Sequence, residues 1–202
     1  MSLNDYLHEH SVIEMEGHSQ QLISQTETLI KLVSPPHIHN IFEIGFNAGH
    51  SSDTFLRAKP DLCVLSCDIQ ARQCVVMGKS YIDSVYPSRH TLLFGDSTKV
   101  IPLLSHDNPQ LTFDVIFIDG NHEYEAAMMD LLHCKQIAHP NTIVIMDDVT
   151  ESCDMDSSPW AVGPTWAWND LVRREIIQEM GHETYTSGRG MSWGIYRFPT
   201  KT

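Results

Sequence analysis

The chain has 202 residues, 42% of them hydrophobic, which is enough for one domain with a sizeable core. Its 26 acidic residues outnumber 13 basic ones and give a formal charge of −13 at pH 7. That charge repels nucleic acid backbones and anionic membrane surfaces, so neither is expected as a partner.

The start of the chain and its cysteines indicate where the protein resides. Residues 1–17 are polar and acidic, without a basic start followed by an apolar stretch, so neither a signal peptide nor a membrane anchor is expected. The cysteines lack the paired spacing of a metal site and are expected as reduced thiols. These features favour a cytoplasmic protein. The five are Cys63, Cys67, Cys74, Cys134 and Cys153.

Hydrophobic periodicity predicts strands and helices in alternation. An N-terminal helical extension is expected over 1–36, with helices at 4–16 and 19–33. Strands are then predicted at 41–44, 63–67, 91–94, 114–118 and 142–146. Helices are predicted between them at 51–56, 72–85, 98–104 and 123–138. Such alternation is typical of parallel strands joined by right-handed crossovers, with helices on both faces of the sheet.

The last fifty residues follow a different pattern. An irregular acidic segment is expected at 150–164, a helix at 166–180 and strands at 183–186 and 193–198. The two strands are separated by Ser187-Gly188-Arg189-Gly190, a connection short enough for an antiparallel pair. The prediction is therefore one α/β domain over 1–202, Rossmann-like and doubly wound. Its sheet is expected to have seven mostly parallel strands and a reversed C-terminal strand.

A glycine loop follows the first predicted strand. Gly45 and Gly49 lie between that strand and a helix, where the lack of a Cβ atom lets backbone N–H groups approach a ligand. Asp68 ends the next strand 19 residues after Gly49, near the spacing at which an acid binds a ribose diol. The alternative is a tight turn with Asp68 solvated. The glycines do not follow the G-x-G-x-x-G dinucleotide pattern, which argues against a nicotinamide cofactor.

Further along the chain, acidic residues end two more predicted strands. Asp119 follows one, and Asp147-Asp148 follow the next, so neighbouring strands would bring three carboxylates together. Such a cluster must protonate, disperse into water or bind a cation, and oxygen ligands favour Mg²⁺. Because consecutive strand residues face opposite ways, Asp147 and Asp148 can share an ion only if the chain turns there. Dispersed, solvated carboxylates are the alternative.

The segment Glu43-Ile44-Gly45-Phe46-Asn47-Ala48-Gly49 resembles the signature of class I S-adenosylmethionine-dependent methyltransferases, and the resemblance covers roughly residues 40–198. It implies that the glycine loop passes around the amino acid end of the cofactor, that Asp68 holds the ribose and that Asp96 with Ser97 lies beside the adenine. The full implied cofactor site is Glu43, Gly45, Phe46, Asn47, Gly49, His50, Ser51, Asp68, Ile69, Gly95, Asp96, Ser97 and Asp119. His50 has the alternative of a solvated helix start.

A second segment, Phe117-Ile118-Asp119-Gly120-Asn121-His122-Glu123-Tyr124, resembles metal-assisted O-methyltransferases of the macrocin, catechol and caffeoyl types. That resemblance implies Asp119, Asp147 and Asp148 as ligands of a divalent ion that binds the acceptor oxygens. The catechol-type enzymes have a lysine base where this chain has His122, a competent base near neutrality. Its alternative role is structural, at a helix start capped by Asn121.

The expected function is therefore S-adenosylmethionine-dependent, Mg²⁺-assisted O-methylation of a small hydroxylated molecule, with Asp119 and His122 as catalytic residues. Trp160, Trp166 and Trp168 are expected to form an apolar acceptor wall, with core packing as the alternative for at least one of them. Segment 150–164 is expected either to cover the acceptor or to place its acids on a solvated surface. Competing functions are a nucleotide-dependent oxidoreductase and a non-catalytic cofactor-binding module. The oligomeric state, including a homo-oligomer, stays open.

Overall fold

The structure is a computed structural model that describes residues 1–12, 17–151, 158–185 and 188–199. The chain forms two compact units, an N-terminal unit of Met1–Ser97 and a C-terminal unit of Thr98–Thr202. The prediction that residues 1–202 act as a single domain stays a prediction. No helix of the described residues is long and apolar enough to span a membrane.

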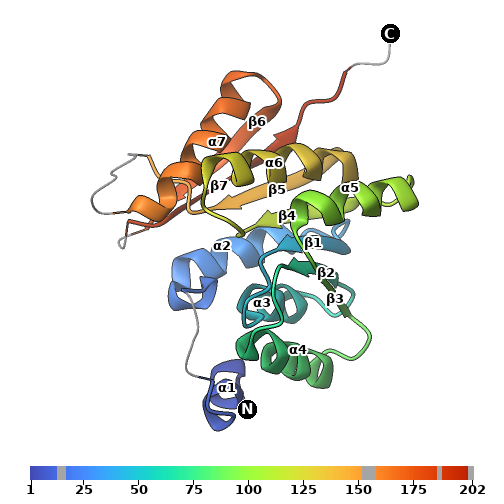
Figure 1. Cartoon of the computed structure of the whole chain (residues 1–202), viewed down its shortest axis with the longest axis vertical. Coiled ribbons are helices and arrows are strands. Elements are labelled where there is room, and N and C mark those ends of the chain that lie inside the picture. The colour runs from blue at the N-terminus through green and yellow to red at the C-terminus, as the bar shows by residue number, and fades with distance from the viewer. Residues whose placement is uncertain (13–16, 152–157, 186–187, 200–202) are drawn as a thin grey trace. The chain divides into compact units, whose positions relative to one another are not determined.

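The N-terminal unit alternates strands with helices, as Figure 1 shows along the chain. Its three strands are parallel, in the order β3-β2-β1. The apolar runs that predicted these strands are buried, with Ile41 and Phe42 fully enclosed. The elements are α1 (Leu3–Glu9), η1 (Ser19–Gln21), α2 (Ile23–Val33), β1 (Asn40–Ile44), α3 (His50–Ala58), β2 (Cys63–Asp68), α4 (Gln73–Val85) and β3 (His90–Phe94).

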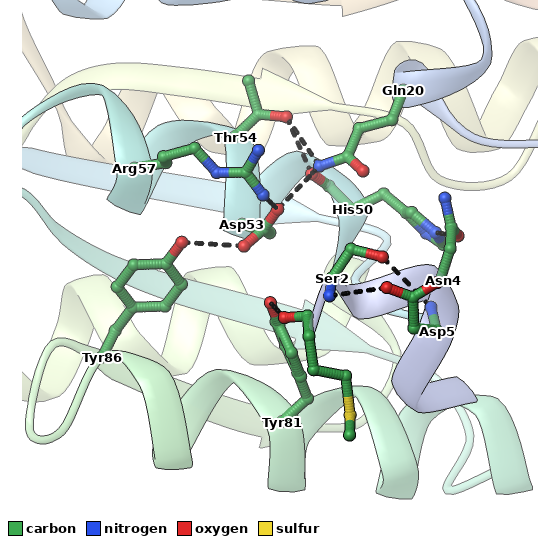
Figure 2. Close-up of polar contacts among 11 residues, drawn as sticks. Ser2, Asn4, Asp5, Gln20, His50, Asp53, Thr54, Arg57, Tyr81 and Tyr86 are labelled. Atoms are coloured by element: carbon green, nitrogen blue, oxygen red, sulfur yellow. Dashed lines mark hydrogen bonds and ion pairs between the residues drawn. The ribbon is translucent and has the colours of Figure 1, made fainter. Parts of the chain in front are cut away.

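The predicted N-terminal extension packs on this unit through a buried carboxylate (Figure 2). Asp53 of α3 is fully buried. Its Oδ1 accepts a hydrogen bond of 2.8 Å from the Tyr86 hydroxyl, and its Oδ2 accepts one of 2.8 Å from Gln20 Nε2 as well as pairing with Arg57. A buried charge is tolerable only when it is paired and hydrogen-bonded, as here. The predicted helix over 4–16 is shorter than expected, and residues 13–16 of it lie outside the described residues.

His50 also faces the N-terminal segment. Its ring stacks on His18 with centroids 3.5 Å apart, and Nε2 donates to Asn4 Oδ1 at 2.9 Å. The residue is 2% exposed, so the alternative of a solvated helix start is wrong. Burial, and then the neighbouring His18, lower the pKa of His50 to about 3. Burial likewise lowers the pKa of His90, at the start of β3, to about 4, with Lys79 as the next cause.

These two histidines are expected to make the fold acid-sensitive. Below the ordinary histidine pKa of 6.5 the unfolded chain takes up protons that the folded chain refuses, so stability falls with pH toward about 4. Each histidine should lower the free energy of unfolding by about 1 kcal/mol between pH 7 and about pH 5.5. Urea denaturation at both pH values measures the loss, and a His50→Gln/His90→Gln double variant should lose about 2 kcal/mol less. An equal loss in the double variant contradicts the explanation.

The C-terminal unit contains four strands in the order β4-β5-β7-β6. β4 and β5 are parallel, whereas β7 runs antiparallel to β5 and to β6. The mostly parallel arrangement of seven strands with a reversed C-terminal strand is thereby confirmed for the described residues. The elements are α5 (Ser97–Asp107), β4 (Phe113–Ile118), α6 (Tyr124–Cys134), η2 (Lys135–Ile137), β5 (Ala138–Asp147), η3 (Pro159–Ala161), α7 (Val162–Arg173), β6 (Ile177–Thr184) and β7 (Gly190–Tyr196).

Part of the predicted tail is wrong. The helix expected over 166–180 begins earlier and ends at Arg173, and residues from Ile177 form β6 instead. The backbone turns at Glu175, which has a φ of 55°. Pairing with β7 outweighs the helix propensity of this charged segment, as tertiary context commonly does. The segment expected to be irregular up to 164 is helical from Pro159, and residues 152–157 lie outside the described residues.

Candidate functional site

The glycine loop between β1 and α3 has the geometry that its sequence predicts. Gly45, Asn47 and Gly49 have φ values of 89°, 47° and 85°, a region that favours glycine and tolerates asparagine. The Gly49 N–H donates to the Phe46 carbonyl at 2.8 Å, which closes the turn immediately before α3. A Cβ atom on Gly49 would lie 2.8 Å from the Phe46 ring, so glycine is required there for space as well.

Asp68 holds this loop from the end of β2. Its Oδ2 accepts a hydrogen bond of 2.8 Å from the Asn47 N–H, and Oδ1 accepts one of 3.1 Å from the Gln70 N–H. Asp68 is 6% exposed, so the alternative of a solvated loop residue is wrong. The next residue, Ile69, is 69% exposed although apolar, which leaves a hydrophobic side chain directly beside the acid.

Glu43 of β1 stabilises the loop through hydrogen bonds to the residues that follow it. Its fully buried carboxylate accepts hydrogen bonds from Ser51, from Ser52 at 2.6 Å and from Ser66 at 2.5 Å. Because the Ser66 hydroxyl donates to Glu43, His90 Nε2 must carry a proton and donate to Ser66 Oγ at 2.9 Å. Glu43 and Ser51 are therefore brought together, as part of a network that fixes the start of α3.

The remaining predicted cofactor residues of this unit take different positions. Phe46 is 1% exposed and packs its ring against His90. Gly95, with a φ of 150°, follows β3 and donates its N–H to the Asp68 carbonyl at 2.9 Å, and the next residues, Asp96 and Ser97, are half-buried. The roles of these residues and of His50 at a cofactor stay predictions.

Gly78 is a residue of this site that the sequence reasoning missed. A Cβ atom there would lie 2.2 Å from the Ala48 carbonyl oxygen, so only glycine lets α4 pack against the glycine loop. A glycine inside a helix costs about 1 kcal/mol relative to alanine, and an unexplained one is a signal of close backbone approach.

In the C-terminal unit, Asp119, His122 and Asp148 come together. Their three ligand-type atoms lie within 4.8 Å of one another. His122 Nε2 is 3.3 Å from Asp148 Oδ2 and 3.9 Å from Asp119 Oδ1. The alternative of dispersed carboxylates is wrong for Asp119 and Asp148. Asp148 is 4% exposed and its Oδ1 has no hydrogen-bond partner within the described residues, which is the kind of buried oxygen a cation would satisfy.

The chain turns at Asp148, as it must if Asp147 and Asp148 are to face the same ion. Asp148 has a φ of 56°, directly after the end of β5 at Asp147. Thr165 of α7 holds this turn, because its Oγ1 accepts a hydrogen bond of 3.0 Å from the Thr150 N–H and donates one of 3.5 Å to the Asp148 carbonyl. The strained turn therefore directs the Asp148 carboxylate toward Asp119 and His122.

His122 is positioned by the segment that follows β4. Asn121 Oδ1 accepts a hydrogen bond of 2.8 Å from the Glu123 N–H and so closes a turn before α6, but the N-cap of α6 is Glu123, so the expected cap at Asn121 is wrong. Gly163 of α7 packs directly on this segment, since a Cβ atom there would lie 2.1 Å from the His122 carbonyl oxygen. This position at the helix start leaves the His122 ring close to both Asp119 and Asp148. The catalytic role of His122 stays a prediction.

Asp147 differs from the other two predicted metal ligands. It is 2% exposed, and its Oδ2 lies 3.4 Å from a terminal nitrogen of Arg189. Arg189 Nε is also 3.7 Å from Asp148 Oδ1. The sequence reasoning missed Arg189, although a single arginine between two glycines in a strand connection is a visible signal. The role of Asp147 as a ligand stays a prediction, as does any contact between Asp119 and the cofactor.

Crowding of charge changes the proton affinities of this cluster. Burial raises the pKa of Asp119, and the charge of Asp147 raises it further. Burial, followed by the charge of Asp119, raises the pKa of Asp148 to about 6. The pKa of His122 is raised first by its polar contact with Asp119 and then by the charge of Asp148, against the effect of burial. Arg189 and His122 act in the opposite direction on Asp119 and Asp148, but the negative charge of the cluster is not fully balanced, since both pKa values remain raised.

The tryptophans divide between core and surface. Trp168 is fully buried and its indole N–H donates to Glu179 Oε2 at 2.5 Å, which confirms core packing for one of them. Trp160 and Trp166 are 40% and 51% exposed. Trp166 borders an open hollow of about 510 Å³ on this unit; its lining residues are Tyr124, Trp166, Asn169, Asp170 and Arg173. An acceptor wall stays a prediction.

Comparison with known proteins identifies the family. A family model described as a methyltransferase domain matches residues 42–149, just over half of the chain. The chain therefore belongs to this methyltransferase family, and the oxidoreductase alternative is not supported. No curated protein sequence matches the chain.

Solved structures share the fold across nearly the whole chain. An O-methyltransferase from Bacillus cereus, in complex with S-adenosylhomocysteine, is 16% identical with a TM-score of 0.73, covering 96% of this chain and 90% of that one. The O-methyltransferase TomG from Streptomyces achromogenes, involved in tomaymycin synthesis and in complex with S-adenosylmethionine, is 18% identical with a TM-score of 0.71, covering 96% and 87%. The chain has the Rossmann-like fold of these enzymes.

Proposed function

We propose that this methyltransferase takes its methyl group from S-adenosylmethionine and transfers it to a hydroxyl of a small molecule with the help of a divalent cation, Mg²⁺ or a similar ion. The observation that carries the proposal is the group of Asp119, His122 and Asp148 in a methyltransferase chain, with one buried Asp148 oxygen left without a hydrogen bond. Solved enzymes of the same fold, the one from Bacillus cereus among them, bind the cofactor or its product.

The N-terminal unit supplies the cofactor site in this proposal. Asp68 accepts hydrogen bonds from the ribose hydroxyls while it keeps the Asn47 N–H. The exposed Ile69 packs on the adenine, and the glycine loop lies around the amino acid end. The acidic surroundings favour the positively charged sulfonium group.

The C-terminal unit supplies the acceptor site. Asp119 and Asp148 are the ligands of the cation in this proposal, because a hard divalent ion prefers carboxylate oxygens. When bound, such an ion lowers the pKa of an acceptor hydroxyl and orients its oxygen. His122 takes the proton of that hydroxyl, since imidazole is an effective base near neutral pH. Trp160 and Trp166 contact the apolar part of the acceptor.

The proposal is tested by incubating the full chain with methyl-labelled S-adenosylmethionine and a panel of catechols, sugars and other vicinal diols. We expect label in at least one acceptor with Mg²⁺ or Mn²⁺ present, and loss of transfer when a chelator is added. Transfer that persists fully in chelator contradicts the metal part. Cofactor binding without transfer to any acceptor favours a non-catalytic binding module instead.

A further inference from the structure

Arg189 lies beside the candidate metal centre in a fixed position. It directly precedes β7, and its carbonyl accepts a hydrogen bond of 2.7 Å from the Tyr185 N–H across the strand connection. The following Gly190 packs so closely that a Cβ atom there would lie 2.1 Å from the Val149 carbonyl oxygen. The Arg189 side chain is only 14% exposed, so its charge is held among the aspartates and not in solvent.

The two aspartates use Arg189 differently. Asp147 Oδ2 accepts a long hydrogen bond of 3.4 Å from the guanidinium. Asp148 has Oδ2 next to His122, while its Oδ1 is 3.7 Å from Arg189 Nε. That distance is too long for a hydrogen bond but short enough for strong attraction between charges in a buried place. Arg189 therefore offsets the negative charge of Asp148 without a hydrogen bond to Oδ1, which leaves that oxygen available to a metal ion.

We propose that Arg189 is a built-in counter-cation of this centre. It keeps Asp147 as its ion-pair partner and competes with the divalent cation for the charge of Asp148. This inference rests on the metal part of the proposed function. A positive charge fixed so close to a ligand repels a divalent ion, so the ion is held weakly and exchanges readily. Removal of the Arg189 charge must then strengthen metal binding.

Titration calorimetry of the full chain with Mn²⁺ alone, without cofactor or acceptor, tests this directly. Arg189→Gln is expected to bind Mn²⁺ about 10-fold or more tightly than the unaltered chain. Arg189→Lys keeps the charge and is expected to bind within about 3-fold of the unaltered chain. The matched control is Arg173→Gln, which removes an arginine of the same unit whose side chain is 76% exposed and should leave affinity unchanged.

Arg189→Gln leaves two buried aspartates without their cation and is expected to be less stable than the unaltered chain. The melting temperature with and without Mn²⁺ is therefore the second measurement. Mn²⁺ should then raise the melting temperature of Arg189→Gln more than that of the unaltered chain, and failure of Mn²⁺ to do so overturns the inference. Equal or weaker Mn²⁺ binding by Arg189→Gln also overturns it, while the metal part of the proposed function survives. If neither protein binds Mn²⁺, both fail together.

Discussion

Replacing Asp148 with asparagine is expected to weaken Mn²⁺ binding by about 100-fold and to lower methyl transfer by about 1,000-fold. Asparagine removes the negative charge but tolerates the left-handed backbone that Asp148 adopts at a φ of 56°. The backbone turn held by Thr165 should therefore persist, so that the loss reports on the carboxylate itself. Calorimetry with Mn²⁺ and the labelled transfer assay measure the two effects.

The matched control for this change is Asp107→Asn. That residue lies in the same unit, and its carboxylate is 68% exposed on the surface. It should bind Mn²⁺ and transfer methyl groups as the unaltered chain does. Unchanged metal affinity in Asp148→Asn would show that Asp148 is not a ligand, and the centre would have to be reassigned.

Replacing Asp68 is expected to give the second large effect, on cofactor affinity. Asp68→Ala should weaken S-adenosylmethionine binding by about 100-fold, because it removes the ribose acceptor and also frees the Asn47 N–H of the glycine loop. Asp68→Asn keeps one oxygen for the Asn47 N–H but loses the charge and the second acceptor, which binds the Gln70 N–H, so about a 10-fold loss is expected. The difference between the variants separates loop support from direct binding.

Asp61→Asn is the control for the Asp68 variants. It removes a half-exposed carboxylate two residues before the opposite end of the same strand, β2, where Asp61 pairs with His39. Cofactor affinity should not change in this variant. If both Asp68 variants also bind S-adenosylmethionine normally, the acid at the end of β2 does not contact the cofactor.

The strands and the glycine loop could be predicted from the sequence because their signals are local. Apolar runs ending in acids marked β1 to β5, and Gly45 and Gly49 marked the loop that follows β1. The same local pattern predicted the meeting of Asp119 and Asp148, since parallel neighbours end at one edge. The prediction for Asp119 and Asp148 required only that β4 and β5 be parallel neighbours in the sheet.

The features that the sequence reasoning missed depend on packing between distant segments. Gly78, Gly163 and Arg189 acquire their roles from backbone or charge that approaches from another element. Strand β6 was predicted in part as helix because its pairing with β7 is not a local property. Strand geometry alone predicts that Asp147 and Asp148 can share an ion only if the chain turns, but only the hydrogen bonds of Thr165 explain how the chain maintains the turn at Asp148.

Calorimetric titration of the unaltered chain with S-adenosylmethionine is the most direct test of the proposed function, because methyl transfer requires this cofactor to bind. Saturable binding of one equivalent is expected at micromolar to submillimolar concentration, with NAD giving no heat under the same conditions. Absence of binding at millimolar S-adenosylmethionine, in a chain shown to be folded, would contradict the account.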